Sequence, residues 1–414
     1  MSGISAILRS ACERAQRSFQ HYGREASLVL LARVLQNVNG FLLSILIVRQ
    51  FGLAAAGTLA VATVATVVIA NLGTFGFTYV FARIDAPAPV KNALGFTAAL
   101  VVVPLSLPFV VALGLIAGHS LEEAAVIAVL SLGGCYFAQT NIASALQVLQ
   151  GRAKQSIIPP AANLVGLIAA GLFGSSYLFF ALILAAFRFV GTLSAFLCLE
   201  RVRIKLSFFW INVRAGAHFL TADILNLGSD QLTVLLASFL MSRMDLGVFG
   251  LCRQMLTVSD TPGWSQVQAK YPVLVSDTAQ TLAELRRTMP RLGAYCGAAV
   301  AVLTLPLGLV VYRSPQFMIL APLLLSSVPL RYLLTVYDVA LRAVGAITAT
   351  NRVSLLRAAF ALAIIPGGAW LSGAAGAVIA TIAHTAISVW LTRRVNAMID
   401  KPVADLHVPG GSLV

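Results

Sequence analysis

Residues 218–240 read HFLTADILNLGSDQLTVLLASFL, a run that is long enough to cross a membrane as a helix. The run nevertheless contains Asp223 and Asp230, seven positions apart, with Asn226 between them. Seven residues are close to two helical turns, so these three side chains share one face of the helix. Each charge in the hydrocarbon region is costly unless it is paired or faces water. Something polar is therefore expected to face this helix.

The whole chain has the composition of a polytopic membrane protein. Of its 414 residues, 59% are hydrophobic and 11% are charged, whereas a soluble domain has about 25% charged residues. The apolar runs lack the alternation of barrel strands, which indicates an all-α fold. We predict twelve membrane-spanning helices, at 27–49, 57–82, 93–117, 122–149, 157–173, 177–199, 215–240, 247–270, 292–312, 317–341, 353–371 and 375–392.

The basic residues indicate topology. The net charge is +14, but the Lys and Arg residues are distributed over the loops instead of forming one basic face, which argues against nucleic-acid binding. With the N-terminus inside, 21 of them fall in inner segments and three, Arg49, Arg243 and Arg313, in outer loops. This bias predicts that both termini are cytoplasmic.

The halves of the chain are expected to form two lobes. We predict an amphipathic interfacial segment at 1–26, a six-helix lobe at 27–200, a cytoplasmic linker at 201–214, a second six-helix lobe at 215–395 and a cytoplasmic tail at 396–414. An offset of 190 residues places Gly73 on Gly263 and the first two spans on the seventh and eighth. Two halves of six spans each have the same orientation, so they would be parallel repeats around a central cavity. The inner loop at 273–291 is expected to carry a short surface helix.

Charged residues recur inside the predicted spans. They are Arg33, Arg188, Asp223, Asp230, Arg253, Asp260, Arg331, Asp338 and Arg357. Spacings of three, four and seven residues place them on stripes with polar neighbours, and Gln139, Gln147 and Gln150 form a milder stripe. Two interpretations stay open: the stripes line a water-filled cavity, or they form buried pairs that hold helices together.

The sequence contains no pattern typical of an enzyme. The histidines inside or near the spans are isolated, no phosphate-binding loop is present, and the five cysteines lack metal-ligand spacing. We therefore predict a protein that is not an enzyme and that has neither a cofactor nor a metal site.

Two segments resemble bacterial polysaccharide flippases. They are VRQFGLAAAGTLAVATVATVVIANLG at 48–73 and DQLTVLLASFLMSRMDLGVFGLCRQM at 230–255. In that family a glycine followed two residues later by an aromatic starts the next helix. Gly247 and Phe249 fit this pattern, whereas Gly57 is followed by Leu59. Asp230 falls where the family often has an aspartate early in the seventh span.

The resemblance implies the multidrug/oligosaccharidyl-lipid/polysaccharide (MOP) exporter superfamily, in its O-antigen (Wzx-type) flippase branch. Such a protein would move undecaprenyl-pyrophosphate-linked oligosaccharide across the bacterial inner membrane by alternating access, for O-antigen, capsule or exopolysaccharide synthesis. The implied partners are this lipid-linked oligosaccharide, membrane lipids, and the polysaccharide polymerase and chain-length machinery as candidates.

This resemblance gives the intramembrane residues expected roles. Arg188 and Arg331 are expected to bind the anionic head group. The full predicted substrate-binding set is Arg188, Arg331, Arg253, Asn37, Gln139 and Gln147. Asp230 and Asp260 are candidates for binding a coupling cation or for holding the arginines. Arg33, Asp223, Asp338 and Arg357 are predicted to form a cytoplasmic gate.

Three alternatives remain. A cation-coupled multidrug exporter of the MATE type would fit the same architecture, although the first half has no acid deep in the membrane. A membrane-embedded polymerase or glycosyltransferase usually has a long outer loop, and none is predicted. A scaffold would have little use for the charged stripes.

Overall fold

The computed structural model describes residues 24–77, 81, 86–199, 204, 206–207, 209–210, 212–213, 231–276, 278–343 and 346–399. The described residues form helices and short connections and include no strand, which confirms the all-α fold class. The chain divides into two compact units, Met1–Leu227 (unit 1) and Gly228–Val414 (unit 2). The predicted interfacial segment before residue 24 and the tail from residue 400 lie outside the described residues.

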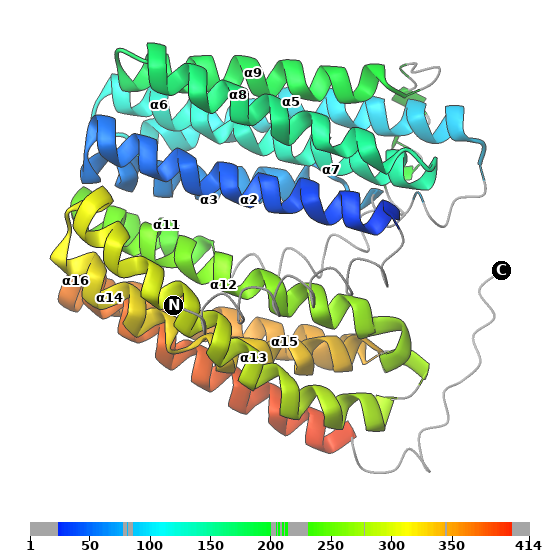
Figure 1. Ribbon diagram of the computed structural model, residues 1–414, viewed down its shortest axis with the longest axis vertical. Coiled ribbons are helices and arrows are strands. Elements are labelled where there is room, and N and C mark those ends of the chain that lie inside the picture. Colours follow the sequence, from blue (N-terminus) through cyan, green and yellow to red (C-terminus); the bar gives the residue numbers. More distant parts are fainter. Residues whose placement is uncertain are drawn as a thin grey trace, which may run out of the picture. The chain divides into compact units, whose positions relative to one another are not determined.

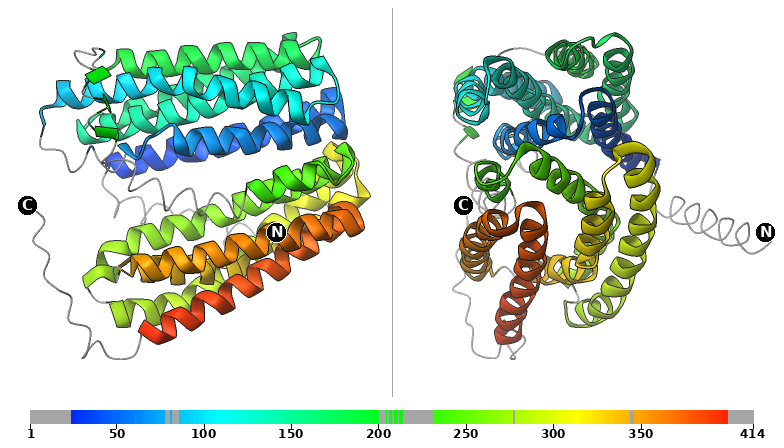
Figure 2. Two further views of the ribbon diagram at one scale, coloured as in Figure 1. Left: turned by 180° about the vertical axis from the view of Figure 1, so that it is seen from behind. Right: turned by 90° about the vertical axis from the view of Figure 1, so that its left-hand side faces the viewer.

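Unit 1 is a bundle of long apolar helices (Figure 1). Its described elements are α2 (Arg24–Phe51), α3 (Leu53–Leu72), α5 (Ala88–Ala117), α6 (Leu121–Ser131), α7 (Gly133–Leu149), the 3-10 helix η1 (Ala153–Ile157), α8 (Ile158–Phe173) and α9 (Tyr177–Leu197). Helices α8 and α9 pack side by side (Figures 1 and 2). A core that includes Ile47, Leu167, Phe180 and Leu184 joins α2, α8 and α9.

Two boundaries in unit 1 differ from the prediction. A single residue, Gly52, joins α2 to α3, and its φ of 85° lies in the left-handed region that favours glycine. The predicted second span continues to residue 82, whereas α3 ends at Leu72. Phe75 and Gly76 follow with φ values of 50° and 68°, a backbone conformation that cannot continue a right-handed helix.

The helices α6 and α7 together form the predicted fourth span. They are separated only by Leu132 and qualify as one membrane-spanning segment, Leu121–Leu149. At the start of α6 the Ser120 hydroxyl accepts the Glu123 amide at 3.1 Å, an N-cap. The Glu123 carboxylate accepts the Thr58 hydroxyl at 2.9 Å, which ties α6 to α3.

Unit 2 contains longer helices and one reversal within an apparently continuous helix. Its described elements are α11 (Leu232–Ser238), α12 (Arg243–Ser276), α13 (Thr278–Pro306), the π-helix η2 (Leu307–Tyr312), α14 (Pro315–Leu325), α15 (Val328–Ala343) and α16 (Ile347–Ile399). The non-helical angles of Ser372 and Gly373 interrupt α16, and Gly373 has a φ of 58°.

The interruption folds α16 back on itself. A Cβ added to Gly376 would lie 2.0 Å from the carbonyl oxygen of Gly368, so only glycine permits this close approach. Further along, the His384 ring contacts the backbone of Arg357, 27 residues earlier. The two arms of α16 are therefore antiparallel and correspond to the last two predicted spans.

The short surface helix predicted within the segment 273–291 is wrong. Helix α12 continues to Ser276 and α13 begins at Thr278, so the short surface helix is the start of a long one. An ion pair between Lys270 and Glu284 joins the two helices beside the turn. At about 1.5 Å per residue, the 34 residues of α12 exceed a ~30 Å hydrocarbon core. A helix of this length can cross the hydrocarbon and still extend beyond it at one end.

In the part of the chain that the structure describes, eight helices are long and apolar enough to cross a membrane, or nine if α14 and α15 form one bent span. One of the eight is the folded α16. A multi-pass membrane protein follows, while the count of twelve spans stays a prediction.

Candidate functional site

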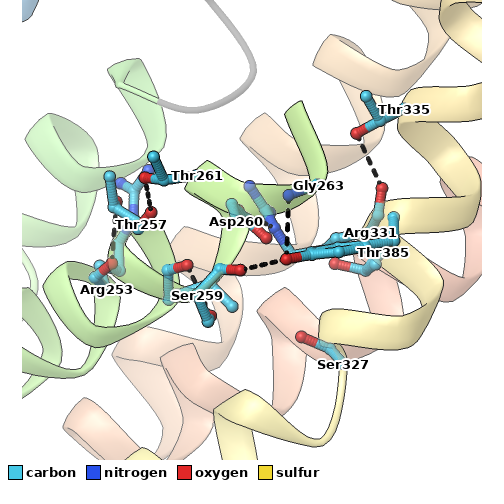
Figure 3. Close-up of polar contacts among 12 residues, drawn as sticks. Arg253, Thr257, Ser259, Asp260, Thr261, Gly263, Ser327, Arg331, Thr335 and Thr385 are labelled. Carbon is cyan, nitrogen blue, oxygen red and sulfur yellow. Dashed lines mark hydrogen bonds and ion pairs between the residues drawn. The ribbon is translucent and has the colours of Figure 1, made fainter. Parts of the chain in front are cut away.

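A guanidinium and a carboxylate meet between α15 and α12 in unit 2. The Nε atom of Arg331 donates to Oδ2 of Asp260 at 2.7 Å, and Figure 3 shows the two side chains pointing toward each other. Their side chains remain 26% and 25% exposed. Because Arg331 offers five N–H donors in a planar fork, it can bind an anionic group while it remains close to Asp260.

Asp260 belongs to a polar stripe along α12, which we call the α12 polar face: Arg253, Thr257, Asp260, Thr261 and Trp264. All five are partly or fully exposed within unit 2, and Trp264 retains 41% exposure. The Thr257 hydroxyl donates to the Arg253 carbonyl at 3.1 Å, and the Thr261 hydroxyl donates to the Thr257 carbonyl at 3.0 Å (Figure 3). The face thus combines two ionised groups, two hydroxyls and an aromatic ring.

Tyr332, the neighbour of Arg331, inserts into the same turn of α12. Its hydroxyl donates to the Ser259 carbonyl at 2.6 Å and accepts the Gly263 amide at 3.1 Å. These are the two backbone groups that pair with each other in an unbroken α-helix. A Cβ on Gly263 would lie 2.5 Å from the tyrosine ring, so the position requires glycine. Pro262 lacks an amide proton and weakens the same turn. Helix α15 thus contacts one turn of α12 in two ways. Tyr332 binds the backbone of that turn, and Arg331 pairs with the Asp260 carboxylate.

A second ion pair lies between α15 and α16. The Nη1 atom of Arg357 donates to both oxygens of Asp338, at 2.8 and 2.9 Å, and the side chains are 12% and 23% exposed. The backbone carbonyl of Arg357 lies 3.1 Å from Nε2 of His384, whose ring also contacts the Ser388 hydroxyl at 3.2 Å. The two predicted gate residues of unit 2 are therefore partners of each other.

The arginine in unit 1 has different surroundings. Arg188 lies near the middle of α9 and is 7% exposed. Its Nε atom donates to the amide oxygen of Asn163 on α8 at 2.8 Å. Its guanidinium carbon lies 5.7 Å from the ring centres of both Tyr136 and Phe137 on α7. None of the described residues provides a carboxylate that pairs with it.

The remaining predicted residues lie in several environments. Arg33 and Asn37 share an exposed face of α2. Asp223 and Asp230 lie outside the described residues, so the predicted gate of Arg33 with Asp223 stays a prediction.

The glutamines of the span-4 stripe are engaged within unit 1. Gln139 donates to the Ala99 carbonyl at 2.7 Å and Gln147 donates to the Ala195 carbonyl at 3.1 Å, and both are buried. Gln150 donates to the Asn92 side chain at 2.6 Å. These bonds support a role in joining α7 to α5 and α9, which is the second of the two interpretations given to polar stripes.

Sequence reasoning missed Tyr332, Asn163 and Tyr136. Each is an ordinary polar or aromatic residue in an apolar run, and its importance depends on a partner from another helix. The Pro262–Gly263 pair was the one local sign that α12 has a special turn. Among the described residues, no three His, Cys, Asp or Glu side chains are grouped as a metal site.

Comparisons by sequence identify no relative. No protein-family model matches the chain. No curated protein matches it either.

Comparisons by structure identify similar folds over nearly the whole chain. The structure titled "Lipid II flippase MurJ, inward closed conformation" has a TM-score of 0.69 and 11% identity, with coverage of 90% of this chain and 87% of that one. A MATE transporter in complex with MaL6 has a TM-score of 0.61 and 13% identity, with coverage of 91% and 96%. An inward-facing multidrug resistance MATE transporter of the MOP superfamily has a TM-score of 0.58 and 15% identity, with coverage of 91% and 96%. The chain therefore has the fold of MOP-superfamily transporters.

Proposed function

We propose that the chain flips a lipid-linked oligosaccharide with a pyrophosphate head group across the bacterial inner membrane, for the synthesis of a surface polysaccharide. The observation that carries the proposal is the pair of arginines at the α12 polar face. Arg253 and Arg331 are both partly exposed, and Asp260, the described carboxylate of this face, is ion-paired with Arg331. Two guanidinium groups near one carboxylate favour an anionic cargo.

The α12 polar face provides suitable groups for both parts of such a head group. Arg253 and the fork of Arg331 would contact the pyrophosphate, because guanidinium groups bind phosphate oxygens in a bidentate manner. Trp264 and the threonine hydroxyls would contact the sugars, since an exposed indole ring offers a flat apolar surface beside hydrogen-bonding groups. The polyprenyl chain can remain in lipid, which needs no polar path.

Asp260 would compete with the cargo for the guanidinium of Arg331. It holds Arg331 when no phosphate is near, and the head group would compete for the same guanidinium. Protonation or cation binding at Asp260 would weaken the ion pair and so favour cargo binding. This exchange would couple an ion gradient to the binding of the cargo.

The proposal can be tested by a leaflet-resolved assay in the native bacterium. Labelled lipid-linked glycan should accumulate in the inner leaflet when this chain is depleted, and re-expression should restore export. Replacing Trp264 by Leu should slow export while drug sensitivity stays the same. Normal delivery of the glycan after depletion would contradict the proposal.

The rival function is cation-coupled multidrug export, which the similarity to MATE transporters supports equally at the level of fold. It predicts the opposite pattern of results. Depletion would increase sensitivity to cationic drugs and leave glycan export intact.

A further inference from the structure

Arg188 is a permanently charged side chain whose described partners are all neutral. Arginine remains protonated in proteins, so burial cannot be relieved by loss of a proton. Asn163 satisfies one donor, Nε, and the rings of Tyr136 and Phe137 cover the guanidinium. Within the described residues, Nη1 and Nη2 form no hydrogen bond. The residue retains 7% exposure.

A second observation points to the same place. The hydroxyls of Tyr136 and Thr140 are sealed from solvent and lie close to each other, and neither forms a hydrogen bond of normal geometry with a described residue. Gly133, Tyr136 and Thr140 recur every three or four residues and share one face of α7. Arg188 lies over this face, because a Cβ on Gly133 would stand 2.5 Å from its Nη1 atom. Unused O–H donors thus lie beside unused N–H donors.

We propose that this site binds chloride, or a monovalent anion of similar size, between the guanidinium and the Tyr136 hydroxyl. Such an ion would neutralise Arg188 and accept hydrogen bonds from donors that no described side chain satisfies. A water molecule could accept the same hydrogen bonds, but it could not compensate the charge.

The enclosure determines the size of the ligand. Tyr136, Asn163 and Thr140 are all buried, and α7, α8 and α9 surround the guanidinium. A pyrophosphate with attached sugars would require these helices to separate. A halide requires only the space next to the two outer nitrogens. The inference is independent of the cargo proposed above, because it concerns equilibrium binding to the protein without any glycan.

The test measures thermal unfolding of the purified full chain while sodium chloride replaces sodium gluconate at constant ionic strength. A bound ion stabilises the folded state in a saturable manner. The expected result is a saturable rise in Tm with chloride and with bromide. Arg188→Gln should abolish the rise. Arg357→Gln, which removes a carboxylate-paired arginine, should retain it.

Tyr136→Phe provides a second variant that keeps the ring over the guanidinium. It should weaken the apparent chloride affinity about 5–10-fold, the effect of one lost hydrogen bond. Unchanged affinity in this variant would overturn the proposed ligand set, even if Arg188→Gln fails to fold. No chloride-specific rise in the wild-type protein, as a water-filled site would give, would overturn the proposal. Competition with chloride by a short prenyl pyrophosphate would reassign Arg188 to the head group and overturn it as well.

Discussion

The two units of this chain surround their intramembrane arginines with different kinds of partner. Each places arginines within membrane-spanning helices, where an uncompensated charge is costly. In unit 2 the partners are carboxylates, Asp260 for Arg331 and Asp338 for Arg357. In unit 1 the partner of Arg188 is the neutral amide of Asn163. These two arginines of unit 2 therefore have carboxylate partners within the unit, whereas the described partners of Arg188 in unit 1 are neutral.

The units share a second feature. In each, a glycine gives space to a large side chain from another helix. A Cβ would lie 2.5 Å from Nη1 of Arg188 at Gly133, and 2.5 Å from the ring of Tyr332 at Gly263. The difference is the rigidity of the neighbour. The guanidinium is the end of a flexible side chain, whereas the tyrosine hydroxyl is bonded to the backbone on both sides of its turn.

The largest expected effect comes from removing the cationic partner of a partly buried carboxylate. Arg357→Gln leaves Asp338 partly buried without its cation, which should cost about 3 kcal/mol of unfolding free energy. Arg188→Gln, measured in gluconate, leaves no carboxylate behind and should cost about 1 kcal/mol. Urea or thermal unfolding of both variants provides the measurement. Equal costs would remove the distinction between the units. The double change Asp338→Asn with Arg357→Gln should recover much of the loss.

The glycine pair gives the next effect. Gly263→Ala should cost about 2 kcal/mol, because the added methyl group meets a ring that cannot move without losing its hydrogen bonds. Gly133→Ala should cost less than 1 kcal/mol, because the guanidinium end can shift. Gly367→Ala serves as the control, since nothing lies within 4 Å of the added Cβ. If Gly133→Ala is the more damaging change, the rigidity argument is wrong.

Transport should respond to the shape of a cation as well as its charge. Arg331→Lys keeps the charge opposite Asp260 but loses the planar fork, so glycan export should fall about tenfold, or 1.4 kcal/mol. Protein abundance and Tm should change little. The substitution Arg253→Lys should reduce glycan export less than Arg331→Lys in the same leaflet-resolved assay. Full export activity in Arg331→Lys would argue against bidentate phosphate binding.

The smallest expected change concerns the inserted tyrosine. Tyr332→Phe removes the hydroxyl between Ser259 and Gly263, which can then pair with each other as in a regular helix. The net cost should be about 1 kcal/mol. Hydrogen exchange at the Gly263 amide would report whether the turn reforms. A loss above about 3 kcal/mol would indicate that the backbone groups stay unpaired.

The sequence predicted the features that depend on local pattern. Apolar run lengths located most of the helices, and the charged positions in the spans gave Arg188, Arg331 and Asp260 as candidate site residues. The pairings depend on contacts between distant segments, such as Arg331 with Asp260, 71 positions apart. Periodicity alone also cannot distinguish a cavity lining from a buried contact. Gln139 and Gln147 have the spacing of a polar stripe, but their amides donate to backbone carbonyls.

The most direct test of the difference between the units is to give unit 1 the carboxylate that unit 2 already has. Asn163→Asp is nearly isosteric and places a carboxylate where the amide oxygen accepts from Arg188 at 2.8 Å. Thermal unfolding of this variant in chloride and in gluconate provides the measurement. We predict that its Tm is independent of chloride and that in gluconate it is at least as stable as the wild-type protein. A chloride-dependent Tm that remains as large as in the wild type would contradict the account.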